Sequence, residues 1–167
     1  MTDAVLGTTM ATPLGDLALL VHDDVLVAAG FTSLDDRYSR LRNAPPLRQV
    51  DDLGRFTEAM SAYFDGDVTA MDTLPVDQRG GPFMQAAWKV MREIPAGEVI
   101  TYTELAERAG SSRAVRAAGS ACATNLLVPI VPCHRIVRTG GNLGGYYYGL
   151  NAKSWLLEHE RRSLTRG

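Results

Sequence analysis

The chain has 167 residues, of which 46% are hydrophobic and 22% are charged, and its formal net charge at pH 7 is −2. This ordinary globular composition allows a real hydrophobic core, in one domain or in two small ones. We find no apolar run long enough to span a bilayer, no signal peptide and no metal-ligand spacing around Cys122 and Cys133. We therefore expect a soluble, cytoplasmic protein with free thiols, no membrane partner, and no bound metal or cofactor.

The charges are unevenly distributed along the chain. Residues 1–80 contain 6 basic and 13 acidic side chains, whereas residues 81–167 contain 11 basic and 6 acidic ones. Chance clustering is one explanation. The other is a basic unit that meets phosphates, joined to an acidic unit that serves as a scaffold.

The first half of the chain predicts a small sheet. Residues 17–21 and 26–31 are apolar and strand-like, and residues 21–25 are typical of a hairpin turn between them. A further strand is expected before Pro13. His22 lies on the turn, where we expect it to be exposed and to have no chemical role.

Two helices are expected after this sheet, at residues 37–42 and 51–64, and the second has apolar side chains at helical spacing. Residues 71–81 contain Pro75, Gly80 and Gly81 and are followed by Pro82, which favours an extended linker. We therefore divide the chain into an N-terminal α/β scaffold domain, residues 1–78, and a C-terminal domain, residues 79–167.

The second half is predicted to be mainly helical. One helix is expected at residues 82–93, and two short ones at 103–109 and 113–123, separated by a Gly-Ser-Ser turn whose serine would cap the second. This helix-turn-helix pattern would put Arg113 and Arg116 on one face of a helix that enters a DNA groove. Two short helices around a glycine turn are also a common packing unit, so the pattern alone leaves DNA binding open.

Cys133 is followed directly by His134 and Arg135, within an apolar run that we expect to be extended. A thiol becomes a nucleophile as the thiolate, and a neighbouring base or cation such as these lowers its pKa. The alternative is that Cys133 is a small buried hydrophobic residue. A last helix is expected at residues 151–162, and its Glu160 would fix the tautomer of His134 if the two side chains meet.

A glycine-rich loop at residues 139–145 and three tyrosines at 146–148 precede this last helix. Glycine loops beside aromatic side chains make adaptable pocket walls. The loop has neither the dinucleotide-binding glycine spacing nor the lysine of a phosphate-binding loop, so we do not expect a nucleotide here.

Several linked motifs occur in order along the second half. They are Val-Ile-Thr-Tyr-Thr-Glu-Leu-Ala at 99–106, Arg-Ala-Val-Arg-Ala-Ala-Gly at 113–119, Asn125, Pro-Cys-His-Arg-Ile-Val at 132–137, and Gly-Leu-Asn-Ala-Lys-Ser-Trp-Leu-Leu-Glu-His-Glu at 149–160. Together they resemble the O6-alkylguanine-DNA alkyltransferases, also called methylated-DNA–protein-cysteine methyltransferases. The resemblance implies an α/β (α+β) chain of two units: a small N-terminal sheet with helices, then a mainly helical domain with a helix-turn-helix.

The resemblance also implies a reaction. Cys133 would take the alkyl group from O6-alkylguanine in DNA, irreversibly and once per chain, and O4-alkylthymine is a second candidate substrate. By analogy His134 draws off the thiol proton through a water, and Glu160 orients His134. Tyr102 would donate a proton or hydrogen bond to the guanine ring, and Asn125 would brace the turn and orient Tyr102 or the cysteine loop.

The partner implied is double-stranded DNA, entered from the minor groove by a monomeric protein. Arg116 matches the arginine that takes the place of the flipped nucleotide. Thr103, Ser111, Arg113 and Thr139 occupy positions that resemble the family's phosphate contacts, and Tyr146 matches a residue of the pocket wall. We also expect Tyr147, Tyr148 and Ile136 to line the substrate pocket.

The sequence departs from the family pattern at two places near the site. Leu126 stands where relatives commonly have proline, and Tyr147 and Tyr148 stand where relatives have small residues, which favours methyl over larger adducts. The family's zinc-binding cysteine cluster is absent. Three alternatives remain: a lesion sensor, in which the cysteine would be replaced, a helix-turn-helix regulator, and a cysteine hydrolase.

Overall fold

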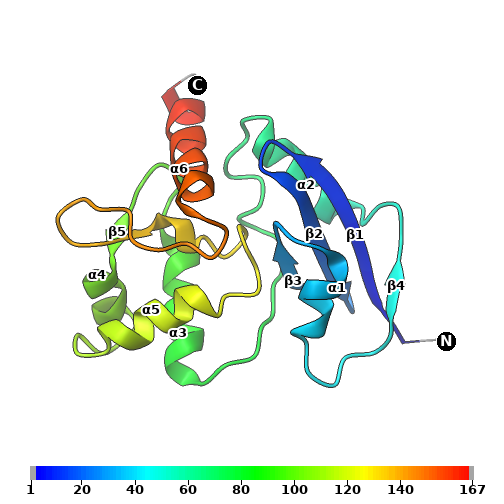
Figure 1. Cartoon of the computed structure of the whole chain (residues 1–167), viewed down its shortest axis with the longest axis horizontal. Coiled ribbons are helices and arrows are strands. Elements are labelled where there is room, and N and C mark those ends of the chain that lie inside the picture. Colours follow the sequence, from blue (N-terminus) through cyan, green and yellow to red (C-terminus); the bar gives the residue numbers. More distant parts are fainter. Residues whose placement is uncertain (1–2, 166–167) are drawn as a thin grey trace. The chain divides into compact units, whose positions relative to one another are not determined.

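The computed structural model describes residues 3–165, and the chain forms two compact units (Figure 1). The first unit comprises Met1–Gln78 and Leu126–Ile130, and the second comprises Arg79–Asn125 and Val131–Gly167. The segment Leu126–Ile130 therefore belongs to the first unit, although a division after residue 78 assigns it to the second.

A four-stranded sheet is the centre of the first unit, with the strand order β3-β2-β1-β4. The strands are β1 (Val5–Thr12), β2 (Gly15–His22), β3 (Val25–Gly30) and β4 (Leu47–Gln49). β2 is antiparallel to both β1 and β3, whereas β4 runs parallel to β1. The strand expected before Pro13 is confirmed as β1. The short β4 was not predicted, because its three residues carry no alternating apolar pattern.

The hairpin between β2 and β3 is also confirmed. It turns at Asp23 and Asp24, whose φ angles of 52° and 62° lie in the left-handed region that aspartate tolerates in such turns. His22 is only partly exposed, and its Nε2 lies 2.7 Å from Oδ1 of Asp3, so this side chain has a structural contact.

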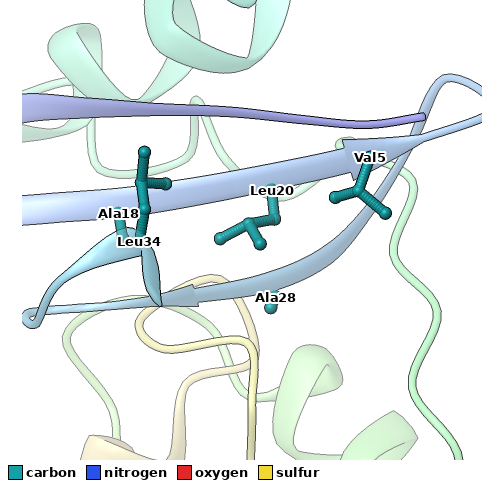
Figure 2. Close-up of a cluster of buried hydrophobic side chains, with 5 residues drawn as sticks. All are labelled: Val5, Ala18, Leu20, Ala28 and Leu34. Carbon is teal, nitrogen blue, oxygen red and sulfur yellow. The ribbon is translucent and has the colours of Figure 1, made fainter. Parts of the chain in front are cut away.

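The hydrophobic core of the first unit lies between the sheet and α1 (Leu34–Ser39). Figure 2 shows five of its side chains, which come from three strands and from the first turn of the helix. They are Val5, Ala18, Leu20, Ala28 and Leu34.

Both helices of the first unit have N-termini that differ from the predicted ones. α1 begins before residue 37 because the Ser33 side chain accepts a hydrogen bond from the backbone N–H of Asp36, at 3.1 Å. α2 (Arg55–Phe64) begins after residue 51, and its N-cap is Gly54, whose φ of 58° is not helical. The predicted inward face of α2 is confirmed, since Phe56 and Met60 are buried.

The segment Leu126–Ile130 lies beside β3 and completes the first unit. The Ala29 N–H donates to the Leu126 carbonyl at 2.7 Å, and the Val128 N–H donates to the Ala29 carbonyl at 3.2 Å. Leu127, Val128 and Ile130 are buried.

The second unit is mainly helical. Its helices are α3 (Pro82–Glu93), α4 (Tyr102–Arg108), α5 (Val115–Ala123) and α6 (Leu150–Thr165), with a 3₁₀ turn η1 (Cys133–Arg135). Two short parallel strands, β5 (Ile100–Thr101) and β6 (Ile136–Val137), pair with each other; β5 precedes α4 in the chain, and β6 follows η1. α3 has the predicted bounds, with Pro82 in its first turn, and the indole N–H of Trp88 on α3 donates to the Ala121 carbonyl on α5 at 2.9 Å.

The turn between α4 and α5 differs from the prediction. α5 starts at Val115 with Ala114 as its N-cap, and no side chain caps it, so the expected serine cap is wrong. Ser111 instead closes the turn, because its N–H donates to the Ala106 carbonyl and its carbonyl accepts from the Ala114 N–H. Arg113 therefore precedes the helix and does not share a helical face with Arg116.

The cysteine segment is also not extended as expected. The Arg135 N–H donates to the Pro132 carbonyl at 3.0 Å, which closes the turn of η1. Among residues 3–165, no helix has both the length and the apolar character needed to cross a membrane.

Candidate active site

A cavity of about 550 Å³ opens in the second unit, between α4, α5 and the loop that follows β6. Its wall is built from Tyr102 and Thr103 on α4, from Val115, Arg116, Gly119, Cys122 and Ala123 on α5, from Cys133, and from Arg138, Thr139, Gly145, Tyr146 and Tyr147 in the loop. The small residues Gly119 and Ala123 leave the backbone of α5 close to this space.

Cys133 lies at the start of η1 and is buried, with 4% of its surface exposed. Burial raises the pKa of its thiol, and a hydrogen bond from Asn125 opposes this effect. The Asn125 amide also donates to the Val131 carbonyl at 2.8 Å, and the Cys133 N–H donates to the same carbonyl at 2.9 Å. Asn125 thus fixes the turn that carries the thiol, and the thiol needs a base to become a thiolate.

His134 and Glu160 meet in the interior, as the sequence analysis anticipated. Both side chains are fully buried, and His134 Nε2 lies 2.8 Å from Glu160 Oε2. Glu160 also accepts from Arg135 at both oxygens, at 2.9 Å each, and Arg135 donates from Nη1 to the Ile94 carbonyl at 2.7 Å. Arg135 is therefore bound to Glu160 and does not supply the cation beside the thiol that the sequence suggested.

The charges in this cluster decide which nitrogen of His134 is basic. Burial alone would raise the pKa of Glu160, but His134 and Arg135 outweigh it, so that pKa lies well below its usual range. The ionised carboxylate only accepts hydrogen bonds, so Nε2 of His134 carries the hydrogen. Burial lowers the pKa of His134 despite the opposing effect of Glu160. The imidazole is thus neutral, and Nδ1, which is buried and has no hydrogen-bond partner among the described residues, is free to accept a proton.

Lys153 is a buried cation that the sequence analysis missed. Its side chain is fully buried, and Nζ donates to the carbonyls of Ile136, at 2.7 Å, of Leu143, and of Gly145, at 3.2 Å. A lysine in the first turn of a helix normally indicates a solvated position, so no pattern identified it. The ammonium group ties the glycine-rich loop to β6 and α6, and its charge lowers the pKa of the Cys133 thiol.

Tyr102 is the first residue of α4 and lines the cavity. Its position is fixed because Thr101 caps this helix, accepting from the Glu104 N–H at 3.1 Å. Burial raises the pKa of Tyr102 to about 12, and the charges that Cys122 and Cys133 carry as thiolates add to the rise. The phenol therefore keeps its proton at neutral pH and can donate it.

The predicted DNA-contacting residues separate into two groups. Arg116, Thr103 and Thr139 are exposed and line the cavity. Ser111 and Arg113 are exposed on the turn between α4 and α5 and do not line it.

Two of the four predicted pocket residues are not among the described residues that line the cavity. Tyr146 and Tyr147 line the cavity, whereas Tyr148 does not, and its ring packs edge-on against both, with centroids at 6.1 and 4.9 Å. Ile136 is buried in β6 and offers its carbonyl to Lys153. Of the two tyrosines that depart from the family pattern, Tyr147 is therefore the one that lines the cavity.

Among the lining residues that the sequence analysis had not placed at the cavity are a second cysteine and a second arginine. Cys122 on α5 is a second thiol, and burial raises its pKa. Arg138 follows β6 and, with Arg116, makes up the charged part of the wall, which carries no acidic side chain.

The geometry defines a protein in which a buried thiol lines a cavity beside a helix-turn-helix, and the residue after that thiol belongs to a histidine–glutamate pair. Residues 82–162 match the family model described as 6-O-methylguanine DNA methyltransferase, DNA binding domain. The methylated-DNA–protein-cysteine methyltransferase of Shigella flexneri is 34% identical over 158 residues, 90% of this chain and 92% of that protein. The one of Mycobacterium bovis is 38% identical over 156 residues, 92% of this chain and 90% of that protein.

The comparison with solved structures agrees with the sequence matches. The crystal structure of Mycobacterium tuberculosis OGT in complex with DNA aligns with a TM-score of 0.83 at 33% identity, covering 96% of this chain and 94% of that one. The chain belongs to the O6-methylguanine-DNA methyltransferase family.

Proposed function

We propose that this protein is a methylated-DNA–protein-cysteine methyltransferase that repairs DNA by direct reversal, with Cys133 as the alkyl acceptor. Relatives that carry this name match most of the chain. The observation that supports the choice of residue is the position of Cys133: it lines the cavity, and the next residue, His134, is hydrogen-bonded to Glu160.

The reaction is a direct displacement. His134 Nδ1 takes the thiol proton through a bridging water, and the Cys133 sulfur attacks the alkyl carbon. The bond from this carbon to O6 breaks, its electron pair stays with the guanine, and Tyr102 gives the guanine a proton. The histidinium proton returns to Tyr102 through solvent, and the thioether remains, so each chain repairs one lesion.

The substrate is double-stranded DNA carrying O6-alkylguanine, bound at the minor groove. A solved relative described as in complex with DNA supports this partner. The flipped base enters the cavity, and Arg116 fills its place in the stack, offsetting part of an unstacking cost of about a few kcal/mol. Thr103, Thr139 and the turn that carries Ser111 and Arg113 contact phosphates, so affinity falls as salt rises.

The proposal includes a monomer in the cytoplasm, with O4-alkylthymine as a second substrate. It also includes a preference for methyl over benzyl adducts, because Tyr147 adds bulk to the cavity wall. Tyr147→Gly should raise the rate with O6-benzylguanine more than the rate with O6-methylguanine. An equal change for both would contradict this preference.

The test is intact-protein mass spectrometry after incubation with a duplex that carries one O6-methylguanine. Wild type should gain one methyl group, localised to the Cys133 peptide and saturating at one per chain, and Cys133→Ser should gain none. Cys122→Ser is the matched control, because Cys122 is the other thiol of the cavity, and it should still be methylated at Cys133.

The alternatives give other outcomes. Lesion-selective binding without a mass gain would mean a sensor or a regulator. A methyl group on Cys122 alone would retain the activity and overturn the assignment of Cys133.

A further inference from the structure

Arg138 is a cation in the cavity wall that the proposed reaction does not yet use. Within residues 3–165, its guanidinium has no ion-pair or hydrogen-bond partner, unlike the buried Arg135. Its backbone is nevertheless fixed, because the Arg138 N–H donates to the Asn142 carbonyl at 2.9 Å and the Arg138 carbonyl accepts from the Gly141 N–H at 3.3 Å. The exposed side chain therefore leaves a defined point of the loop, and its charge is not paired with a carboxylate among the described residues.

Gly144 shows where this side chain runs. A Cβ atom added to Gly144 would lie 2.9 Å from Cε2 and 3.0 Å from the hydroxyl oxygen of Tyr102, and 3.4 Å from Cγ of Arg138. The stem of Arg138 and the hydroxyl end of Tyr102 thus meet at the same glycine. The absence of a side chain at Gly144 lets the two approach each other.

The charges around Tyr102 agree with this placement. Burial and the two cavity thiols raise the pKa of Tyr102, whereas Arg138 opposes the rise. Lys153 is the other nearby cation, but its Nζ lies 5.8 Å from the centre of the Tyr102 ring and is bound to loop carbonyls. Arg138, whose stem lies beside the hydroxyl end of Tyr102 at Gly144, makes no such bond among residues 3–165, so its donors are available.

We propose that Arg138 is a positioning residue for alkyl transfer, whose guanidinium stabilises the negative charge that forms on the Tyr102 oxygen as Tyr102 protonates the departing guanine. This proposal rests on the proposed function. In the step concerned, the Cys133 sulfur bonds to the alkyl carbon, the carbon–O6 bond breaks, and the Tyr102 O–H proton moves to the guanine ring. The charge left on the phenolate oxygen faces Arg138 until the proton that His134 removed returns through solvent.

A bound phosphate is the other role open to an unpaired arginine beside a DNA-binding helix. The two roles differ in what they need. A phosphate contact requires the DNA backbone, whereas help to Tyr102 requires only the base in the cavity.

The experiment compares two substrates that carry the same methyl group: a duplex with one O6-methylguanine, and the free base O6-methylguanine, which has no phosphate. Single-turnover methylation of the full chain is followed by mass spectrometry for wild type, Arg138→Met and Arg138→Lys. Arg138→Met should slow transfer from both substrates by about tenfold, the size expected for one charge acting close to a developing anion. Arg138→Lys should recover most of the rate, because it keeps the charge.

The Tyr102→Phe background separates this role from a structural one. If Arg138 acts through the Tyr102 hydroxyl, Arg138→Met should add almost nothing to the slowing that Tyr102→Phe causes alone. A loss with the duplex only, with a normal free-base rate, would overturn the proposal in favour of a phosphate contact. Equal slowing by Arg138→Met with and without the Tyr102 hydroxyl would overturn it too. Failure of wild type to accept any methyl group would instead refute the proposed function.

Discussion

One carboxylate binds two partners in the interior of the second unit. Glu160 accepts from His134 and, at both oxygens, from Arg135, and the three side chains are almost fully excluded from solvent. A charge at this depth is tolerated only while it is paired. Arg135 therefore keeps Glu160 ionised, and the ionised Glu160 fixes the His134 tautomer whose Nδ1 is basic.

Removing Arg135 should destabilise the folded chain, because the buried Glu160 carboxylate would then keep only His134 as a partner. Arg135→Met should lower the free energy of unfolding by about 3–5 kcal/mol, and equilibrium urea denaturation measures it. Arg161→Met is the matched control on α6, since Arg161 pairs with Glu158 at the surface, and its change should stay below about 1 kcal/mol. Similar losses in the two variants would show that Arg135 does not stabilise a buried charge.

The pH dependence of stability follows from His134. Burial holds its pKa in the folded chain below the ordinary 6.5, so the unfolded chain binds a proton first as the pH falls. The stabilisation is complete above pH 6.5 and declines as the pH drops from 6.5 towards the folded pKa. Urea denaturation between pH 8 and 5, roughly the range in which histidine titrates, should show this decline in wild type and a smaller one in His134→Gln. Identical slopes would rule the mechanism out.

Some roles of single residues could be predicted from the sequence, and others could not. Glu160 and His134 could be paired because a family resemblance links motifs that are far apart in the chain. The contacts of Arg135 and Lys153 could not be predicted, because a buried cation is defined by carbonyls and carboxylates that only the fold brings to it. Arg138 had no periodic or motif signal.

At the scale of elements, the glycine-rich loop after β6 determines the wall of the cavity. Lys153 on α6 ties the carbonyls of Leu143 and Gly145 to β6, and Gly144 lies between Tyr102 and Arg138. The loop therefore has a defined shape without regular secondary structure.

Gly144→Ala tests this shape. Gly144 has φ of 75°, and the new methyl group would lie 2.9 Å from the Tyr102 ring, so we expect Tyr102 to move and alkyl transfer to slow by about tenfold or more. Gly141→Ala is the control, because Gly141 has φ of 94° but no atom within 4 Å of an added Cβ. It should share the backbone strain, about 1 kcal/mol, and keep the transfer rate. Single-turnover methylation and thermal unfolding of both variants distinguish an effect of backbone strain from an effect of displacing Tyr102.

Elements with strong periodicity were predicted well and those set by local caps were not. α3 has the predicted bounds because Pro82 and the spacing of its apolar residues indicate the same helix. α1 begins earlier than predicted because Ser33 caps it. α5 begins later because the backbone hydrogen bonds of Ser111 extend the turn before it. Both starts are set by individual hydrogen bonds, from the Ser33 side chain in one case and from the Ser111 backbone in the other, and no periodic pattern in the sequence reports such bonds.

At the scale of the whole molecule, the chain leaves the second unit after Asn125 and re-enters it at Val131. The residues between them belong to the first unit, where Leu127 is fully buried beside β3. A composition-based boundary could not predict this, because an apolar run of this length is compatible with either unit.

Leu127→Ala should therefore destabilise the first unit although Leu127 lies within the sequence of the second. We expect a loss of about 2–4 kcal/mol from the cavity left behind. Hydrogen exchange measures it at the Ala29 amide, which donates to the Leu126 carbonyl. Leu164→Ala, at an exposed position of α6, is the control and should leave that amide protected. Unchanged protection in Leu127→Ala would contradict the role of the segment.

The same segment constrains the order in which a ribosome can produce a folded chain. The first unit lacks the neighbour of β3 until Ile130 has been synthesised, and by then the sequences of α3, α4 and α5 have already been synthesised. The N-terminal sheet therefore cannot finish folding as an independent early domain during translation, as N-terminal domains generally do. Its completion requires the stretch just before Cys133, the proposed alkyl acceptor, so the last part of the scaffold and the thiol are synthesised within a few residues of each other.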